Sequence, residues 1–149
     1  MKKSAITKPQ DRLKSAREDR DDLLTNVVWL DDARVASIGG ALSDAAEYAS
    51  RLRRDKRLFG VRYRGEYLHP KFQFREDGQV HPAIANLLEI LPSTDENWTA
   101  AFWLFQPHGR FSGKSPAEVF EESPNDVVEL AREDFIIGPE EGDAVVSKL

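Results

Sequence analysis

The chain has 149 residues, enough for one ordinary domain or two very small ones, and 40% of them are hydrophobic and 32% charged. It contains no cysteine, which excludes disulfides and thiolate metal sites, and its histidines (His69, His81 and His108) lack the spacing of metal ligands. The basic N-terminus lacks the apolar stretch of an export signal, and no segment reads as a membrane span, so we expect a cytoplasmic protein without a membrane partner.

The net charge of −5 hides two blocks of opposite sign. Residues 51–75 contain nine basic residues against two acidic ones, a net charge of +7. Residues 115–149 contain ten acidic residues against two basic ones, a net charge of −8. Two such blocks on a small chain favour two surfaces with different partners, although two solvated faces would give the same pattern.

The first part of the chain changes from charged to apolar near residue 23. Residues 1–22 have mixed charges and little apolar content, which is typical of a charged arm, either a frayed helix or disordered. Residues 23–42 have the apolar density of one or two short helices that end at Gly39-Gly40. Ser43 is the predicted cap of the next helix.

A basic helix and a hairpin follow. Ala45, Tyr48, Ala49 and Leu52 recur at helical spacing, and the arginines are expected on the opposite arc. Residues 58–74 alternate aromatic and β-branched residues with arginine, and Arg64-Gly65 marks the tip of a predicted hairpin.

This layout is that of a helix-plus-wing DNA reader, and a small sheet with solvated arginines is the alternative. The segment between Ser43 and Phe59 has room for one helix but hardly for a complete helix-turn-helix. The residues that we assign to DNA contact are Arg51, Arg53, Arg54, Lys56, Arg57, Arg62 and Arg64.

From residue 80 onward the pattern is helical. His81-Pro82 opens a first helix, and Ser93 with Glu96 predicts a capping box for a second one. The second helix is apolar nearly all round from Trp98 to Phe105, so we expect it to be the buried centre of the domain. A later helix begins at Ser123-Pro124 and ends at Gly138-Pro139.

The stretch that ends in Gly113-Lys114-Ser115 is almost a phosphate-binding loop. A P-loop needs four residues between its glycines and a strand before it, because loop length sets how the N–H groups surround a phosphate. Only three residues separate Gly109 from Gly113, and a predicted helix precedes them. Ser115 as N-cap, with Pro116 next and Glu118 at the third helical position, predicts a capped helix start instead.

No catalytic constellation is visible in the sequence. Ser112 and Ser115 have only His108 nearby, and a serine nucleophile needs a base that a third group orients. We therefore expect a binding protein with no cofactor and no metal, with an enzyme that uses the near-P-loop as a remote alternative.

Three motifs of the helical half occur in a familiar order: Trp103-Leu104, then the turn and helix FSGKSPAEVF from Phe111 to Phe120, then the closing helix residues 127–130 with Gly138. In these motifs, residues 80–138 resemble the toxin-binding domain of the Xre/MbcA/ParS-type antitoxins. The resemblance implies a bacterial antitoxin that covers the active site of a toxin, commonly a RES-domain enzyme that consumes NAD. It also implies promoter binding and homo-oligomers, so we expect a homodimer. The multi-helix Xre-type DNA-binding region usual at the family's N-terminus is not recognisable here.

The expected fold class is mainly α with a small β-hairpin (α+β): a helical C-terminal bundle preceded by a wing-like helix-plus-hairpin unit. The expected regions are a charged arm (1–22), a winged-helix-like region (23–79), a helical toxin-binding domain (80–138) and an acidic tail (139–149). The leading hypothesis is an antitoxin-like protein that neutralises a partner toxin and also binds promoter DNA. The alternative is a DNA-binding transcriptional regulator whose helical domain serves for dimerisation. The residues assigned to toxin contact are Trp103, Phe111, Gly113, Lys114, Ser115, Pro116, Phe120, Phe135, Lys148 and Leu149. The acidic tail is interpreted either as a plug for a cationic NAD cleft or as a solubilising segment.

Overall fold

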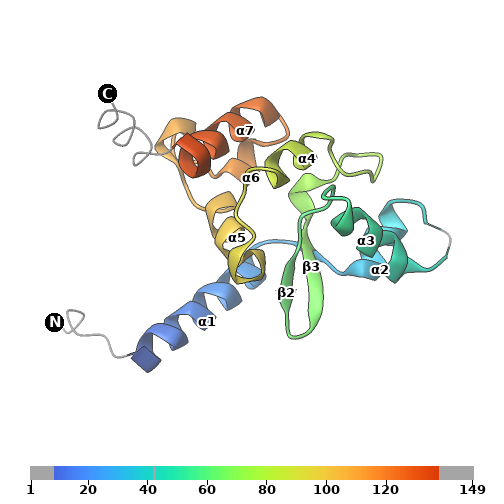
Figure 1. The fold of residues 1–149 in the computed structure, drawn as a ribbon, viewed down its shortest axis with the longest axis horizontal. Coiled ribbons are helices and arrows are strands. Elements are labelled where there is room, and N and C mark those ends of the chain that lie inside the picture. Colours follow the sequence, from blue (N-terminus) through green and yellow to red (C-terminus); the bar gives the residue numbers. More distant parts are fainter. Residues whose placement is uncertain (1–8, 42, 138–149) are drawn as a thin grey trace.

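The structure is a computed structural model, and it describes residues 9–41 and 43–137. Three short strands lie among seven α-helices in these ranges, in a mainly helical fold with one small antiparallel sheet (Figure 1). This confirms the expected α+β class. The α-helices and strands are α1 (Pro9–Asn26), β1 (Trp29–Leu30), α2 (Asp32–Ile38), α3 (Ala45–Arg54), β2 (Val61–Tyr63), β3 (Glu66–Pro70), α4 (Ala83–Leu88), α5 (Trp98–Leu104), α6 (Pro116–Val119) and α7 (Pro124–Arg132).

Short helical turns connect several of these elements. They are the 3₁₀ turns η2 (Lys71–Gln73), η3 (Thr94–Asn97) and η4 (Gly109–Phe111) and the π-helical turn η5 (Glu133–Ile137). The predicted helix stop at Gly138-Pro139 and the acidic tail lie outside the described residues, as do Lys148 and Leu149. No helix in the described ranges has both the length and the apolar character that crossing a membrane requires.

The predicted hairpin is present, and it gains a third strand. β2 pairs with β3 in antiparallel register, Val61 opposite Leu68, and the two-residue strand β1 pairs with the other edge of β3. Arg64 and Gly65 form the predicted tip, and both have positive φ angles (53° and 82°), as a type I′ hairpin turn requires. β1 is too short to show a periodic pattern, which is why the sequence did not reveal it.

α2 and α3 form a helix-turn-helix, and the hairpin follows directly. The two helices lie side by side at the right of Figure 1. Asp31 caps α2 by accepting a hydrogen bond from the Arg34 backbone N–H (2.9 Å), and α2 ends at Gly39 as predicted. The prediction that the segment between Ser43 and Phe59 holds only one helix is confirmed, because α3 alone lies there. The helix-turn-helix is complete because its first helix, α2, precedes Ser43.

The start of α3 also differs from the prediction. Its N-cap is Asp44, which has a left-handed backbone (φ 53°) and makes no side-chain cap hydrogen bond, so Ser43 is not the cap. The predicted apolar face is correct: Ala49 is fully buried and Tyr48 and Leu52 pack beside it. The helix-turn-helix thus has a small cluster of its own, made of Leu30, Val35, Ala49 and Leu58.

A larger cluster joins the hairpin to the helical half. The buried side chains of Phe59 and Val61 belong to the same cluster as Trp98, Leu104 and Phe120. Trp98 is fully buried, and its indole N–H donates to the backbone carbonyl of Arg62 (2.9 Å). α5 is therefore the buried centre that the sequence predicted.

The two predicted capping boxes had different outcomes. The box at Ser115 is confirmed, because its hydroxyl accepts from the Glu118 N–H (3.2 Å) and the Glu118 carboxylate accepts from the Ser115 N–H (2.8 Å). The box at Ser93 was wrong: Ser93 makes no cap hydrogen bond and α5 begins only at Trp98. Asn97 has a left-handed backbone there, and its side chain donates to the Gly60 carbonyl (2.8 Å) instead.

The charged N-terminal segment is helical from Pro9 onward. α1 has 18 residues, and in Figure 1 it projects away from the rest of the molecule. Its C-terminal part holds it in place, since Leu23 and Leu24 pack against the larger cluster. Arg20 forms an ion pair with Asp95 (2.6 Å).

Candidate nucleic-acid interface

The candidate interface is built by α3 and the hairpin. Arg51 and Arg54 extend from α3 with side chains that are 57% and 60% exposed. Arg62 and Arg64 are exposed on β2 and at the hairpin tip. The local sequence explains both placements: α3 buries the opposite side at Ala49, and the hairpin turns at Arg64-Gly65.

The exposed side of α3 also contains an acidic residue, Glu47, which contacts two of its arginines. The Glu47 carboxylate lies 3.5 Å from the guanidinium groups of both Arg51 and Arg54. Exposed pairs of this length contribute little to stability, so both arginines can exchange this carboxylate for another anion.

Aromatic rings of the sheet support the arginines of the hairpin. The guanidinium carbon of Arg62 lies 4.8 Å from the ring centre of Tyr67, and that of Arg64 lies 5.1 Å from the ring centre of Tyr63. Cation–π contacts of this kind order the side chains and leave their N–H groups available to a phosphate.

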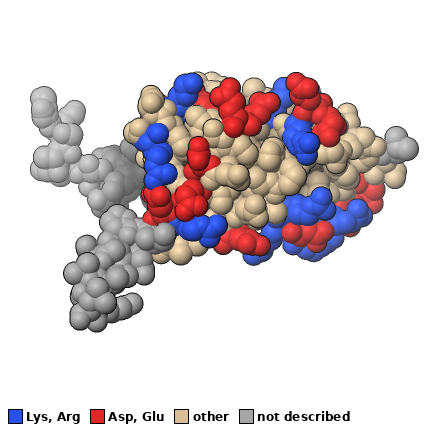
Figure 2. Space-filling model, turned by 90° about the horizontal axis from the view of Figure 1, so that it is seen from above, with Lys and Arg blue, Asp and Glu red and all other residues tan. Residues whose placement is uncertain are grey.

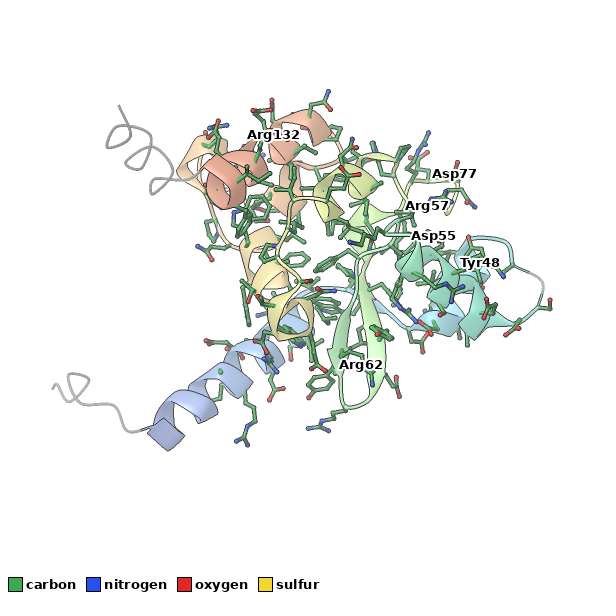
Figure 3. The ribbon with its side chains drawn as sticks, in the orientation of Figure 1. Tyr48, Asp55, Arg57, Arg62, Asp77 and Arg132 are labelled. Carbon is green, nitrogen blue, oxygen red and sulfur yellow. The ribbon has the colours of Figure 1, made fainter. Side chains whose placement is uncertain are left out.

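Lys56 and Arg57 are exposed and follow the end of α3. Figure 3 shows Arg57 close to Asp55 and well separated from Arg62 on the hairpin, whereas Lys56 lines a hollow together with Arg53 and Tyr67. The structure therefore does not bring all of the basic residues predicted for DNA contact onto one surface.

Arg53 is a clear exception to the expected exposed arc. Its side chain is only 15% exposed, and its guanidinium pairs with Asp32 (2.8 Å) and lies 3.7 Å from the ring centre of Tyr67. The physical reason is the helix period, because Arg53 lies one turn after the buried Ala49 and so faces the sheet. Arg53 is corrected from a DNA-contacting residue to a packed one.

Two buried polar residues of this region were missed by the sequence. His69 is fully buried; its Nδ1 lies 2.7 Å from the Leu30 carbonyl and its Nε2 lies 2.8 Å from the Arg53 guanidinium. Burial lowers the pKa of His69, as does the charge of Arg53, while the hydrogen bond to Leu30 opposes this shift. The alternation of buried and exposed side chains that is expected along a strand was the only signal in the sequence for the burial of His69.

Gln73 is the second missed residue. It is fully buried, its amide oxygen accepts from the Phe59 N–H (2.9 Å), and its amide nitrogen donates to the carbonyls of Phe59 (2.9 Å) and Pro70 (3.0 Å). Gln73 thus connects the chain just before β2 to the end of β3.

The residues assigned to toxin contact do not form one surface. Trp103, Ser115, Pro116 and Phe120 are buried, so they build the helical core and are not accessible to a partner in this structure. Among the others that the structure describes, Gly113 and Lys114 are exposed, and Phe111 and Phe135 are partly buried.

A groove of about 820 Å³ lies beside the Gly113–Ser115 turn. Val28, Phe72 and Phe105 are among its apolar lining residues, and Glu118 and Glu121 are its acidic ones. Val28 has the largest exposed fraction, 60%, among the big hydrophobic residues of the described chain. This groove thus presents an accessible, partly apolar surface next to the motif that carries the antitoxin resemblance.

The near-P-loop is a connection between helices. α5 and not a strand precedes it, Gly113 has a left-handed φ of 89°, and the chain runs directly into the Ser115 cap. The His108 ring packs edge-on against Trp103 (5.6 Å between ring centres). Within residues 9–41 and 43–137, no group of three or more histidine or acidic side chains is arranged to hold a metal ion.

Charges are mixed on the face seen from above the view of Figure 1. Basic and acidic side chains alternate there around a central area without charged residues (Figure 2). A polyanion would therefore find no uniform positive patch on this face, in contrast to the arginines of α3 and the hairpin.

Comparisons with known proteins give one informative similarity. No family model matches the chain, and a search of curated proteins found no match. Among solved structures, the chain is similar to the NMR structure of Rv2175c, with a TM-score of 0.59 and 25% sequence identity over 72% of this chain and 80% of that one. The two chains thus share their overall fold over most of their lengths.

Proposed function

We propose that the protein is a DNA-binding regulator that acts by binding and not by catalysis. The observation that carries this proposal is the direct succession of α2, a turn, α3 and an arginine-bearing hairpin. In this arrangement the second helix enters the major groove and the hairpin follows the adjacent backbone. The fold similarity to Rv2175c covers 72% of this chain, so the fold on which the proposal is built also occurs in a solved structure.

The exposed arginines have distinct roles in this proposal. Arg51 and Arg54 approach base edges or phosphates from α3, where a guanidinium can bind guanine through two hydrogen bonds. Arg62 and Arg64 bind phosphates and fix the register of the protein on the duplex. Both arginines would exchange their weak 3.5 Å pairs with Glu47 for contacts with DNA.

The test is a titration of a fluorescent duplex, carrying the protein's own promoter fragment, at several salt concentrations. Binding should weaken steeply with salt, by roughly 0.9 in the logarithmic slope for each phosphate neutralised. Alanine at Arg51, Arg54, Arg62 and Arg64 together should abolish binding and leave the circular dichroism spectrum unchanged.

A matched control replaces basic residues away from this surface, namely Arg75, Lys114 and Arg132. This variant should bind DNA as the wild type does. The proposal is wrong if the wild type does not retain the duplex even at low salt, or if the control variant loses binding as completely as the first one.

A second candidate function rests on the groove beside the Gly113–Ser115 turn. We propose that the groove, and not the buried Trp103 and Phe120, receives a partner toxin if the antitoxin resemblance extends to function. Homodimer formation stays a prediction from the same resemblance.

The test is co-expression with the toxin gene next to this one. Val28→Glu places a charge in the groove and should abolish the rescue of growth, whereas Ile136→Glu, at an apolar residue that is 53% exposed and does not line the groove, should preserve it. Full rescue by Val28→Glu would exclude the groove as the contact surface.

A further inference from the structure

A partly buried polar cluster, with the fully buried His69 at its centre, lies between the helix-turn-helix and the sheet. It consists of Asp32 from α2, Arg53 from α3, and Tyr67 and His69 from β3. The Arg53 guanidinium contacts all three of the other members: Asp32 at 2.8 Å, His69 Nε2 at 2.8 Å and the Tyr67 ring centre at 3.7 Å. A single side chain of α3, which is the recognition helix in the proposed function, therefore contacts both α2 and strand β3 of the hairpin.

The three contacts restrict the orientation of the Arg53 guanidinium. A guanidinium is planar, so the stack on Tyr67 sets its plane, and the bonds to Asp32 and His69 set its rotation within that plane. The Tyr67 ring also contacts Arg62 of the hairpin, whose guanidinium carbon is 4.8 Å from the ring centre. A change at Arg53 would thus alter both α3 and the support of a wing arginine.

The protonation of His69 decides whether the cluster holds together. The Leu30 carbonyl can only accept a hydrogen bond, so Nδ1 carries the proton and the neutral ring leaves Nε2 free to accept from Arg53. A second proton would place two cations 2.8 Å apart. The charged or titratable groups that face His69 are Arg53 on α3, Tyr67 on β3, and Asp31 and Asp32 at the start of α2.

We propose that Arg53 is a positioning residue for DNA binding: it fixes the recognition helix relative to the wing through Asp32, Tyr67 and His69 and does not itself touch DNA. This inference rests on the proposed function. It differs from a general stabilising role, because it requires an effect on DNA affinity under conditions in which the protein is fully folded.

The first experiment compares adjacent arginines, each replaced by methionine, in duplex titrations well below the unfolding temperature. Arg53→Met should weaken binding about tenfold, equivalent to the loss of one hydrogen bond to a charged group, without changing the salt slope. Arg54→Met should lower the slope by about one phosphate, since Arg54 is exposed on α3. Arg53→Lys should not restore affinity, because an ammonium cannot stack on Tyr67 and bind both other partners.

The second experiment is a pH profile of the wild type between about pH 7 and about pH 5. Added protons normally strengthen binding to DNA, whereas protonation of His69 should weaken it by releasing Arg53. Because burial lowers the pKa of His69, the decrease should begin only below the ordinary histidine value of about 6.5. His69→Gln keeps an acceptor for Arg53 that cannot take up a proton, so this variant should not show the decrease.

The outcomes separate this inference from the function on which it rests. If the wild type does not bind the duplex at low salt, the proposed function and the role of Arg53 both fail. If the wild type binds, the role of Arg53 alone is refuted when Arg53→Met binds normally or lowers the salt slope, or when affinity does not fall on acidification. If Arg53→Met does not fold, the pH profile of the wild type and of His69→Gln decides.

Discussion

At the residue scale, Gln73 is the strongest test of how buried polar groups hold the sheet. Replacing it by leucine removes two N–H donors and one acceptor and leaves the Phe59 N–H and two backbone carbonyls without their partners. The expected loss is at least about 2 kcal/mol of unfolding free energy, because buried unsatisfied groups cost about 1–3 kcal/mol each.

Urea unfolding of the variant checks this value. Gln106→Leu is the matched control, because Gln106 is exposed and its replacement should change stability by less than about 0.5 kcal/mol. Equal stabilities for the two variants would show that the Gln73 hydrogen bonds contribute nothing net.

Ser115 and Ser123 offer a comparison of two serines that each precede a proline at a helix start. The Ser115 hydroxyl accepts from the Glu118 N–H, whereas Ser123 makes no side-chain cap hydrogen bond. Ser115→Ala should therefore cost about 1 kcal/mol, and Ser123→Ala much less. Thermal unfolding of the two variants measures the difference, and a larger loss at Ser123 would contradict it.

These residues also show which details a sequence can reveal. The Ser115 cap is local, since all its partners lie within three residues, and the sequence predicted it correctly. Gln73 and His69 bind partners 14 and 39 residues away, so no short pattern contains the reason for their burial. Arg53 was misplaced although its spacing of four residues from Ala49 puts it near the buried face of α3, and only its partners Asp32 and His69 come from other elements.

At the element scale, the sequence predicted helices on both sides of Gly39-Gly40 but did not show that they combine into a helix-turn-helix. The stop at Gly39 and the apolar face of α3 were both predicted, but α2 was not combined with α3. The turn between them has a left-handed residue, Asp44, in place of a recognisable serine cap. β1 was missed because it has two residues and pairs with β3 across the chain.

Arg64, at the hairpin tip, has a backbone conformation that is unfavourable for arginine, and we expect this to lower the stability of the protein in exchange for a DNA contact. Arg64 has a φ of 53°, a left-handed conformation in which asparagine is favoured at this turn position over other side chains. Arg64→Asn should raise the unfolding free energy by about 0.5 kcal/mol and at the same time weaken DNA binding by removing a phosphate contact.

The two effects are measured by urea unfolding and by duplex titration. Arg62→Asn is the control: it should weaken DNA binding as well, but it should not stabilise the protein, since Arg62 lies within β2 where asparagine is unfavourable. A stabilised Arg64→Asn variant with unchanged affinity would remove Arg64 from the interface.

At the scale of the whole molecule, the boundary expected near residue 80 does not coincide with a gap in the packing. Phe59 and Val61 lie before it and share a cluster with α5 and α7. Val80 packs against both clusters, and the Trp98 indole bonds to the hairpin backbone at Arg62. Composition changes near residue 80 and favours a boundary there, but only the three-dimensional contacts show that the core continues across it.

This continuity leads to a prediction about cooperativity. Val35 belongs to the small cluster of the helix-turn-helix, whereas Trp29, Trp98 and Trp103, the only tryptophans of the chain, all belong to or pack against the larger cluster. If the two clusters unfold as one unit, Val35→Ala should lower the midpoint of tryptophan fluorescence in urea, with a loss of about 1–3 kcal/mol, although no tryptophan belongs to the small cluster. Far-UV circular dichroism should give the same midpoint, and Ser37→Ala, at an exposed position of the same helix, should leave both unchanged. An early loss of helical signal with an unaltered fluorescence midpoint would instead establish two independent units, and the helix-turn-helix would then unfold without disturbing the helical half.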